Sequence, residues 1–253
     1  MRRAAFALIL LLHSAYSSRL ALADPTFEPV GQAQIQSVVD GMTAILSDGR
    51  RLRLTGIEAP QRGVLAAQAK TALADLIASH PVELRSAGNA SDRQGRVLAQ
   101  VYAGSVWIQG ELLQRGLVRV HSTADNRRGV TDMLTLERQA RRYHRGLWAD
   151  RTYALRSADD AVEVTGSFQL VRFTVAEIAT AGDQMLISAG PDRRTAFALT
   201  LTPPVVKLCR DAGLDPMALK GKQILARGFI DGRVRPTIAI THPEQIEILA
   251  RKK

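Results

Sequence analysis

Three short segments decide the fold of this 253-residue chain: Val38-Val39-Asp40-Gly41-Met42-Thr43, Arg53-Leu54-Thr55-Gly56-Ile57-Glu58-Ala59-Pro60-Gln61 and Asp92-Arg93-Gln94-Gly95-Arg96. Each joins apolar or turn-forming residues to charged or amide side chains. The first two are separated by Ser47-Asp48-Gly49, and an Asp-Gly pair between two apolar runs is a strong hairpin signal. The first two segments therefore belong to neighbouring antiparallel strands.

The rest of the first half follows from apolar spacing. Residues 64–78 are alanine-rich, with leucine and isoleucine at helical spacing and Pro81 just beyond, which predicts a helix. The other elements expected, in chain order, are strands at 34–38, 44–46, 51–54, 82–84 and 97–102, then helices at 107–114 and 131–144. Three strands, a helix, two strands and two helices is the order of an OB-type barrel elaborated with helices.

The three segments, in this order and spacing, resemble the staphylococcal-nuclease (thermonuclease) family over residues 34–150, and Arg145-Gly146-Leu147-Trp148-Ala149 is similar to a typical family ending. The resemblance implies a β-barrel with helices (α+β) of the OB-fold type, a fold that commonly binds oligonucleotides. It also implies phosphodiester hydrolysis with calcium held by two aspartates and a backbone carbonyl. A glutamate would position or deprotonate water, and two arginines would contact the phosphate.

Arg53 and Arg96 match the two phosphate-contacting arginines. Their planar forks suit bidentate phosphate contacts that lysine cannot reproduce. The alternative is that each pairs with a nearby carboxylate, such as Asp92 or Glu58. We expect a phosphate-binding site, or its relic, at these two residues.

The residues at the implied metal site differ from the family pattern. Glu58 falls at one aspartate position and keeps the charge, whereas Met42 falls at the other and offers a soft, neutral thioether that suits calcium poorly. Asp40 would share a strand face with Met42, so it could hold a shifted ion together with Glu58. Alternatively, Asp40 stabilises the turn of its Asp-Gly pair. Calcium is therefore the implied cofactor, and these residues argue against it.

Gln61 stands where the family has its glutamate. A neutral amide can orient water but cannot accept its proton, and general-base catalysis contributes roughly 10²–10⁴-fold. The sequence therefore predicts a nucleic-acid- or phosphate-binding OB-fold that is impaired or inactive as a calcium-dependent nuclease. The alternative is an active phosphodiesterase for DNA or RNA with a rearranged metal site. A third possibility is an envelope structural protein that contacts no nucleic acid.

Residues 1–23 predict an export signal, with the cationic Met1-Arg2-Arg3, an apolar stretch and the small-x-small site Ala21-Leu22-Ala23. We expect a periplasmic or secreted protein with no membrane span after cleavage. Removing Arg2, Arg3 and Arg19 with the signal lowers the formal net charge from +10 to +7. This excess suits nucleic acid or another polyanion, although solubility alone would also explain it. The oligomeric state stays open.

Residues 161–250 predict a second small β-rich domain, possibly OB-like, after a linker at 151–161. Strand-like segments at 224–230 and 237–240 flank Asp231-Gly232 and indicate a hairpin. The single Cys209 excludes an intramolecular disulfide framework and is expected to be buried. Aromatic residues make up only 5% of the chain, which argues against an extensive base-stacking surface.

Basic residues cluster near the end of the helix predicted at 131–144. Cations there complement the helix dipole, and a nucleic-acid footprint is the alternative. The members of this cluster are Arg138, Arg141, Arg142, His144 and Arg145.

Overall fold

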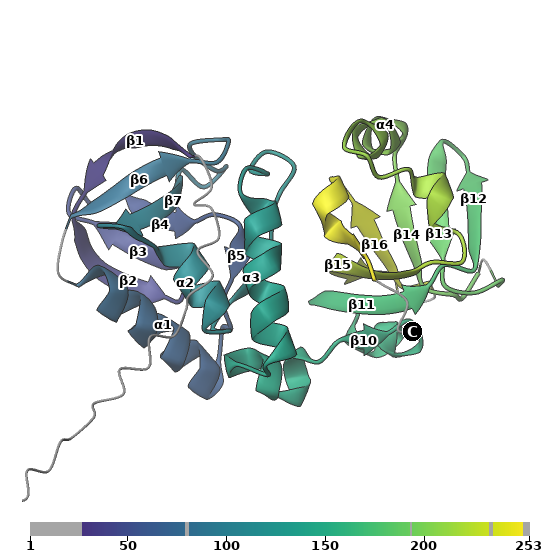
Figure 1. Ribbon diagram of the computed structural model, residues 1–253, viewed down its shortest axis with the longest axis horizontal. Helices are drawn as coiled ribbons and strands as arrows, with labels where there is room; N and C mark the ends of the chain where they lie inside the picture. The colour runs from purple at the N-terminus through teal and green to yellow at the C-terminus, as the bar shows by residue number, and fades with distance from the viewer. Residues whose placement is uncertain (1–26, 79–80, 193, 233–234, 250–253) are drawn as a thin grey trace, which may run out of the picture.

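The computed structural model describes residues 27–78, 81–192, 194–232 and 235–249, so the export signal predicted at 1–23 lies outside the described residues. Two β-barrels follow one another along the chain. Helix α3 (Val130–Arg142) lies on the side of the first barrel that faces the second (Figure 1). Among the described residues, no helix is both long and apolar enough to cross a membrane.

The first barrel is closed by a bent strand. Its sheet runs in the order β1-β6-β7-β4-β3-β2, with β8 paired to β7. The strands are β1 (Glu28–Ala33), β2 (Ile35–Asp40), β3 (Thr43–Leu46), β4 (Arg51–Leu54), β6 (Val82–Ser86), β7 (Val97–Ala103) and β8 (Val106–Trp107). Only Gln34 separates β1 from β2, so the two ends of the sheet are halves of one strand. The pairing of β4 with β7 is parallel and the others along this path are antiparallel.

Three helices cover this barrel. They are α1 (Gly63–Ile77), α2 (Ile108–Gln114) and α3, all within two residues of the predicted bounds. Helix α1 buries Ala69, Leu73 and Ile77 against the strands. The small strands β5 (Ile57–Glu58) and β9 (Arg119–Val120) pair with each other beside them. The predicted α+β barrel is thus confirmed, and its first strand begins at Glu28, ahead of the expected start at residue 34.

The second barrel has the same connections as the first. Its sheet runs β10-β11-β15-β16-β14-β13-β12, with β17 paired to β15. The strands are β10 (Arg156–Ser157), β11 (Phe168–Thr174), β12 (Glu177–Ala181), β13 (Gln184–Ser188), β14 (Ala198–Leu201), β15 (Gln223–Asp231), β16 (Thr237–Ile240) and β17 (Ile246–Ile248). Two residues separate β11 from β12, which again form one bent strand that pairs with β15 at one end of the barrel sheet and with β13 at the other, and β10 is added outside β11.

Further features establish the OB-like topology of the second barrel. Strands β14 and β16 pair in parallel, as β4 and β7 do in the first barrel. Helix α4 (Pro203–Asp211) follows the third strand, in the place that α1 occupies, and begins with two prolines suited to a first turn. Cys209 lies buried on it as a free thiol. The β-rich, OB-like domain expected at 161–250 is therefore confirmed in type.

The segment expected to be a linker has structure of its own. Residues 151–161 include the 3₁₀ turn η2 (Arg151–Tyr153) and the strand β10, which pairs in parallel with β11. The turns η1 (Gly146–Ala149) and η3 (Asp159–Val164) flank it, and η4 (Pro216–Leu219) and η5 (Pro243–Gln245) lie further along the chain. The second folded unit therefore begins by Arg156.

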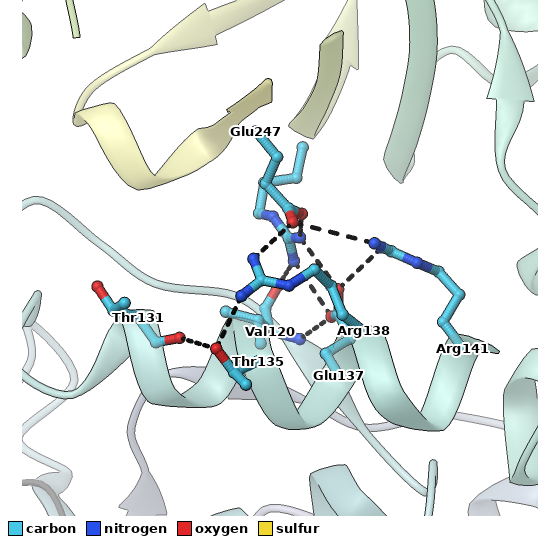
Figure 2. Close-up of polar contacts among 8 residues, drawn as sticks. Val120, Thr131, Thr135, Glu137, Arg138, Arg141 and Glu247 are labelled. Atoms are coloured by element: carbon cyan, nitrogen blue, oxygen red, sulfur yellow. Dashed lines mark hydrogen bonds and ion pairs between the residues drawn. The ribbon is translucent and has the colours of Figure 1, made fainter. Parts of the chain in front are cut away.

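The two barrels share a small apolar core. Ala140, Leu147 and Trp148 of the first unit pack with Phe168, Leu170 and Leu225 of the second. Beside this core, Arg227 on β15 donates to both carboxylate oxygens of Glu137 on α3, at 3.1 and 3.0 Å, and pairs with Glu247. Figure 2 shows Glu137, Arg138 and Arg141 projecting from α3 toward Glu247. Buried charge pairing thus joins the barrels as well as apolar contact.

Candidate phosphate-binding site

Arg53 and Arg96 lie beside one cavity of about 220 Å³. Arg53 is on β4, which pairs in parallel with β7, and Arg96 immediately precedes β7. Asp92 organises the intervening loop, because its Oδ1 accepts hydrogen bonds from the backbone N–H groups of Gln94 and Arg96 at 2.9 and 3.0 Å. The two arginines predicted from sequence to act together are therefore brought together.

Arg96 is paired within the protein. Its Nε donates to Asp92 Oδ2 at 2.6 Å. Desolvation raises the pKa of Asp92, but the hydrogen bonds from Arg96 and Gln94 outweigh it and lower that pKa below its usual value. The carboxylate pairing considered as the alternative for Arg96 is thus observed, and it holds the guanidinium at the cavity wall.

Arg53 has no such carboxylate partner among the described residues. Its Nη2 donates to the carbonyl oxygen of Ile57 at 3.0 Å, and its Nη1 is buried without a hydrogen-bond acceptor there. Burial and the neighbouring charge of Arg96 lower the pKa of Arg53, although a guanidinium stays protonated at neutral pH. An unpaired donor on a buried cation is costly unless a ligand satisfies it.

Asn126 adds a second unsatisfied group to the same cavity. The residue is 6% exposed, and its Oδ1 is buried with no donor among the described residues. His121 lies nearby because its backbone N–H donates to the carbonyl of Gly56 at 2.9 Å. Two residues that line the cavity thus carry a buried, unsatisfied polar atom, a donor on Arg53 and an acceptor on Asn126.

Asp40 stabilises a turn. Its Oδ1 accepts the backbone N–H of Met42 at 2.9 Å, and Gly41 and Met42 form the turn between β2 and β3. A Cβ on Gly41 would lie 2.6 Å from the Cβ of Ala69 on α1, so glycine is required for this close approach. The expectation that Asp40 and Met42 share a strand face was wrong, because the strand ends at Asp40.

Met42 fills the place of the expected aspartate with a thioether that has its own partner. The backbone N–H of Ala59 donates to Met42 Sδ at 3.2 Å, and the side chain packs against the main core of the first barrel. A sulfur atom that accepts a hydrogen bond and contacts apolar side chains is a poor ligand for a hard cation.

The carboxylate of Glu58 also has a partner within the protein. Its Oε2 accepts from Arg119 Nε at 2.9 Å and pairs with Arg119 Nη2 at 2.9 Å. This partner lies 61 residues away and was not foreseen. Within the part of the chain that the structure describes, no three acidic, histidine or cysteine side chains gather in a way that could hold a metal ion. The shifted ion considered for Asp40 and Glu58 therefore has no further side-chain ligands of these types there.

Gln61 lies exposed at the start of the segment leading into α1. Its Nε2 donates to the carbonyl of Ala59 at 2.8 Å, so the amide is turned to the backbone beside Met42. A glutamate at this position could not make that contact, since a carboxylate only accepts.

The basic cluster predicted near the end of α3 is divided. Arg138 pairs with Glu247 of the second barrel at 3.1 Å, and Arg141 pairs with Glu137 on α3 at 3.3 Å and with Glu247 at 3.9 Å. Arg145 donates to the carbonyl of Gln114 at 3.1 Å. Two of the five residues thus join the barrels, which neither the helix-dipole interpretation nor the nucleic-acid interpretation had foreseen.

A buried histidine links the same region of the two barrels. Nε2 of His242 is hydrogen-bonded to Ser122 Oγ at 2.7 Å, and its Nδ1 to Thr241 Oγ1 at 2.8 Å. Burial lowers the pKa of His242 to about 4. Because Ser122 immediately follows His121, this contact fixes the loop that borders the cavity.

The lowered pKa of His242 predicts how stability depends on pH. Between about pH 6.5, the unfolded pKa, and pH 4, the unfolded chain takes up a proton that the folded chain excludes. As the pH drops through that window, this group should therefore lower the free energy of unfolding by about 3 kcal/mol. Above about pH 6.5 the histidine is neutral in both states and causes no such loss. Urea unfolding of the parent and of His242→Gln at several pH values measures the difference. Parallel pH profiles for the two proteins would contradict this assignment.

Comparisons with known proteins agree with this geometry. Residues 51–150 match the family model described as "Staphylococcal nuclease homologue". Two curated relatives come from Oryza sativa subsp. japonica. "Probable staphylococcal-like nuclease CAN2" is 28% identical over 128 residues, which is 50% of this chain and 33% of the relative. "Probable staphylococcal-like nuclease CAN1" is 28% identical over 106 residues, 42% of this chain and 30% of the relative. The chain thus matches about a third of each relative's length.

Proposed function

We infer that this chain, which belongs to the staphylococcal nuclease family through its domain at residues 51–150, is an exported protein that binds nucleic acid and is impaired or inactive as a calcium-dependent nuclease. The family is one of phosphodiester hydrolases that act on nucleic acid. The inference about this member rests on the residues that its site keeps and on those that it replaces.

The cavity beside Arg53 and Arg96 is the main observation in favour of nucleic-acid binding. Its buried, unpaired Arg53 Nη1 and the neighbouring Arg96 offer charge-assisted contacts to a phosphate. The basic excess of the chain adds long-range attraction for polyanions. Together they support phosphate-backbone recognition.

The replaced residues support the inference that the chain is impaired or inactive as a calcium-dependent nuclease. Calcium would need hard oxygen ligands, whereas Met42 presents sulfur, and the Glu58 carboxylate is held by Arg119. No carboxylate stands at position 61 to take a proton from water. The residues present therefore fit calcium poorly, and no catalytic step is assigned to it.

The alternative is an active phosphodiesterase that uses a metal held by Asp40 and Glu58. Each carboxylate uses one oxygen in a contact within the protein, Asp40 Oδ1 with Met42 N–H and Glu58 Oε2 with Arg119, so an ion would bind through Asp40 Oδ2 and Glu58 Oε1. Metal-dependent cleavage that is lost in Glu58→Gln would favour this alternative.

Substituting Arg53 tests the binding site. We expect Arg53→Gln to weaken binding of a fluorescent single-stranded DNA by about 10-fold, since a hydrogen bond to a charged group is worth about 1.5–3 kcal/mol. The salt dependence should become shallower, because one fewer phosphate is neutralised. Fluorescence anisotropy at several salt concentrations measures both quantities.

Arg51→Gln is the matched control, because Arg51 lies on the same strand, is exposed and carries the same charge, but does not line the cavity. Equal losses in the two variants would mean that only overall charge attracts the DNA. Binding that is absent at all salt concentrations would instead support an envelope structural role.

A further inference from the structure

A larger cleft adjoins the phosphate-binding cavity. It has a volume of about 720 Å³ and lies between residues 121–124 of the first unit and the outer surface of the second barrel. Small-molecule sites span about 300–1,000 Å³. His121 and Thr123 line both this cleft and the cavity that contains Arg53 and Arg96. A ligand held at the arginines can therefore extend into the cleft.

An aromatic cluster lines this cleft. The ring of His121 lies 4.6 Å from that of Phe168 and 5.7 Å from that of Phe229, and the two phenylalanine rings are 5.6 Å apart. Phe168 is 4% exposed, whereas Phe229 is 54% exposed. Two neighbouring rings thus hold Phe229 in place while much of its side chain stays accessible.

Polar side chains from the second barrel surround this ring. The side chain of Phe229 projects outward from β15. Other strands of the second barrel contribute side chains that can donate or accept hydrogen bonds. These are Gln184 on β13, Thr200 on β14 and Thr237 on β16. The second and third strands of OB barrels form a common binding face for oligonucleotides. Here β13 and β14 are those strands.

The cleft and the adjoining cavity that contains Arg53 and Arg96 differ in the charge of their side chains. Burial lowers the pKa of His121, so its ring is neutral at neutral pH. Arg227, which also lines the cleft, is neutralised by Glu137 and Glu247. The arginines suited to phosphate are Arg53 and Arg96, in the adjoining cavity. Asp231 also lines the cleft, and its exposed carboxylate can accept hydrogen bonds from a base but would repel a phosphate, so the cleft suits an uncharged, flat group with polar edges.

We propose that the cleft is a nucleobase-binding subsite, in which a base of single-stranded nucleic acid stacks on Phe229 while its backbone phosphate lies at Arg53 and Arg96. This rests on the proposed function and specifies its substrate class. A paired base in a duplex cannot offer its face, so the subsite selects single strands. It also gives the second barrel a direct part in binding.

The experiment compares two labelled oligonucleotides of equal length, one of thymidines and one with the same backbone but with abasic sites. Phe229→Ala should weaken binding of the thymidine oligonucleotide by about 10-fold, a typical loss for one base–aromatic stack, and leave the abasic oligonucleotide unchanged. Arg53→Gln should weaken both. Phe229→Trp should restore binding of the thymidine oligonucleotide, since it keeps an aromatic face.

Met217→Ala is the matched control, because Met217 is 51% exposed, lies in the same domain and does not line the cleft. Losses that are equal for both oligonucleotides, or no loss with Phe229→Ala, would overturn the subsite while leaving phosphate binding intact. If neither oligonucleotide binds the parent, the proposed function itself fails, and the subsite fails with it.

Discussion

The double change Met42→Asp plus Gln61→Glu is expected to raise calcium-dependent cleavage of single-stranded DNA by about 10²-fold or more over the parent, because a general base alone contributes roughly 10²–10⁴-fold. Asp at position 42 would place a hard oxygen where Met42 Sδ now accepts from Ala59 N–H. Glu at position 61 would supply the missing proton acceptor. Initial rates of oligonucleotide cleavage in calcium and in EDTA measure the gain.

The matched control is Met42→Asn plus Gln61→Glu, which keeps the size of the new side chain at position 42 and omits its charge. It should cleave far more slowly than the double acid variant, since calcium needs the second carboxylate. Glu58 is held by Arg119 in the present structure, so the ion must compete with that guanidinium. Equal rates in the parent and in the double acid variant would show that these two replacements do not limit catalysis.

Arg227→Met is expected to lower the free energy of unfolding by about 3–5 kcal/mol, the usual cost of removing one partner from a buried ion pair. Arg227 is 1% exposed and holds Glu137, which is 0% exposed, beside Glu247. Without the guanidinium, two buried carboxylates would face one another across the contact between the barrels. Urea unfolding at neutral pH measures the loss.

Arg138→Met provides the comparison for this prediction. Arg138 also pairs with Glu247, but its side chain is 46% exposed, and pairs of that kind contribute about 1 kcal/mol or less. If the two variants lost similar amounts of unfolding free energy, the buried pairing of Arg227 would contribute no more than the exposed pairing of Arg138, which would contradict this prediction. Figure 2 shows how Arg138 and Glu247 meet above α3.

Much of the fold could be predicted because apolar spacing specifies the longer elements. Helix α1 appears nearly as expected because it buries side chains at helical spacing, and strand β7 because it buries a continuous run at 99–102. Strand β1 was missed because Glu28–Ala33 is mostly exposed and includes both proline and glycine. The two-residue strands β5 and β9 are too short to give a periodic signal.

The sequence indicated a second, possibly OB-like domain, but it contained no recognisable internal repeat that would show the shared topology of the two barrels. Both have a bent first strand, a helix after the third strand and a parallel pair between the third and fifth strands. The third strand of each barrel buries two leucines, Leu52 and Leu54 in the first and Leu199 and Leu201 in the second, but elsewhere the cores differ, since the second core cluster contains Phe173 and Phe197 and the first has no phenylalanine among the described residues. A core needs suitable volume and alternation rather than particular residues, so the repeat is visible only in the structure.

The sequence predicted the site residues that lie within a local sequence motif. Arg53 and Arg96 stand in recognisable motifs, and Asp40 beside Gly41 indicated the turn that the structure contains. The missed residues act across long separations. Arg119 meets Glu58, and Phe229 meets His121, only because β9 and β15 bring them together. Local spacing carries no information about such contacts.

Cleavage and binding measured on the same sample of the parent chain show whether it binds nucleic acid without cleaving it. A labelled single-stranded DNA is mixed with the protein in calcium, magnesium, manganese or EDTA, and anisotropy and fragment length are read together. We expect salt-sensitive binding with the DNA left intact under all four conditions. Rapid cleavage that needs a metal ion and stops in EDTA would contradict this expectation and identify an active nuclease.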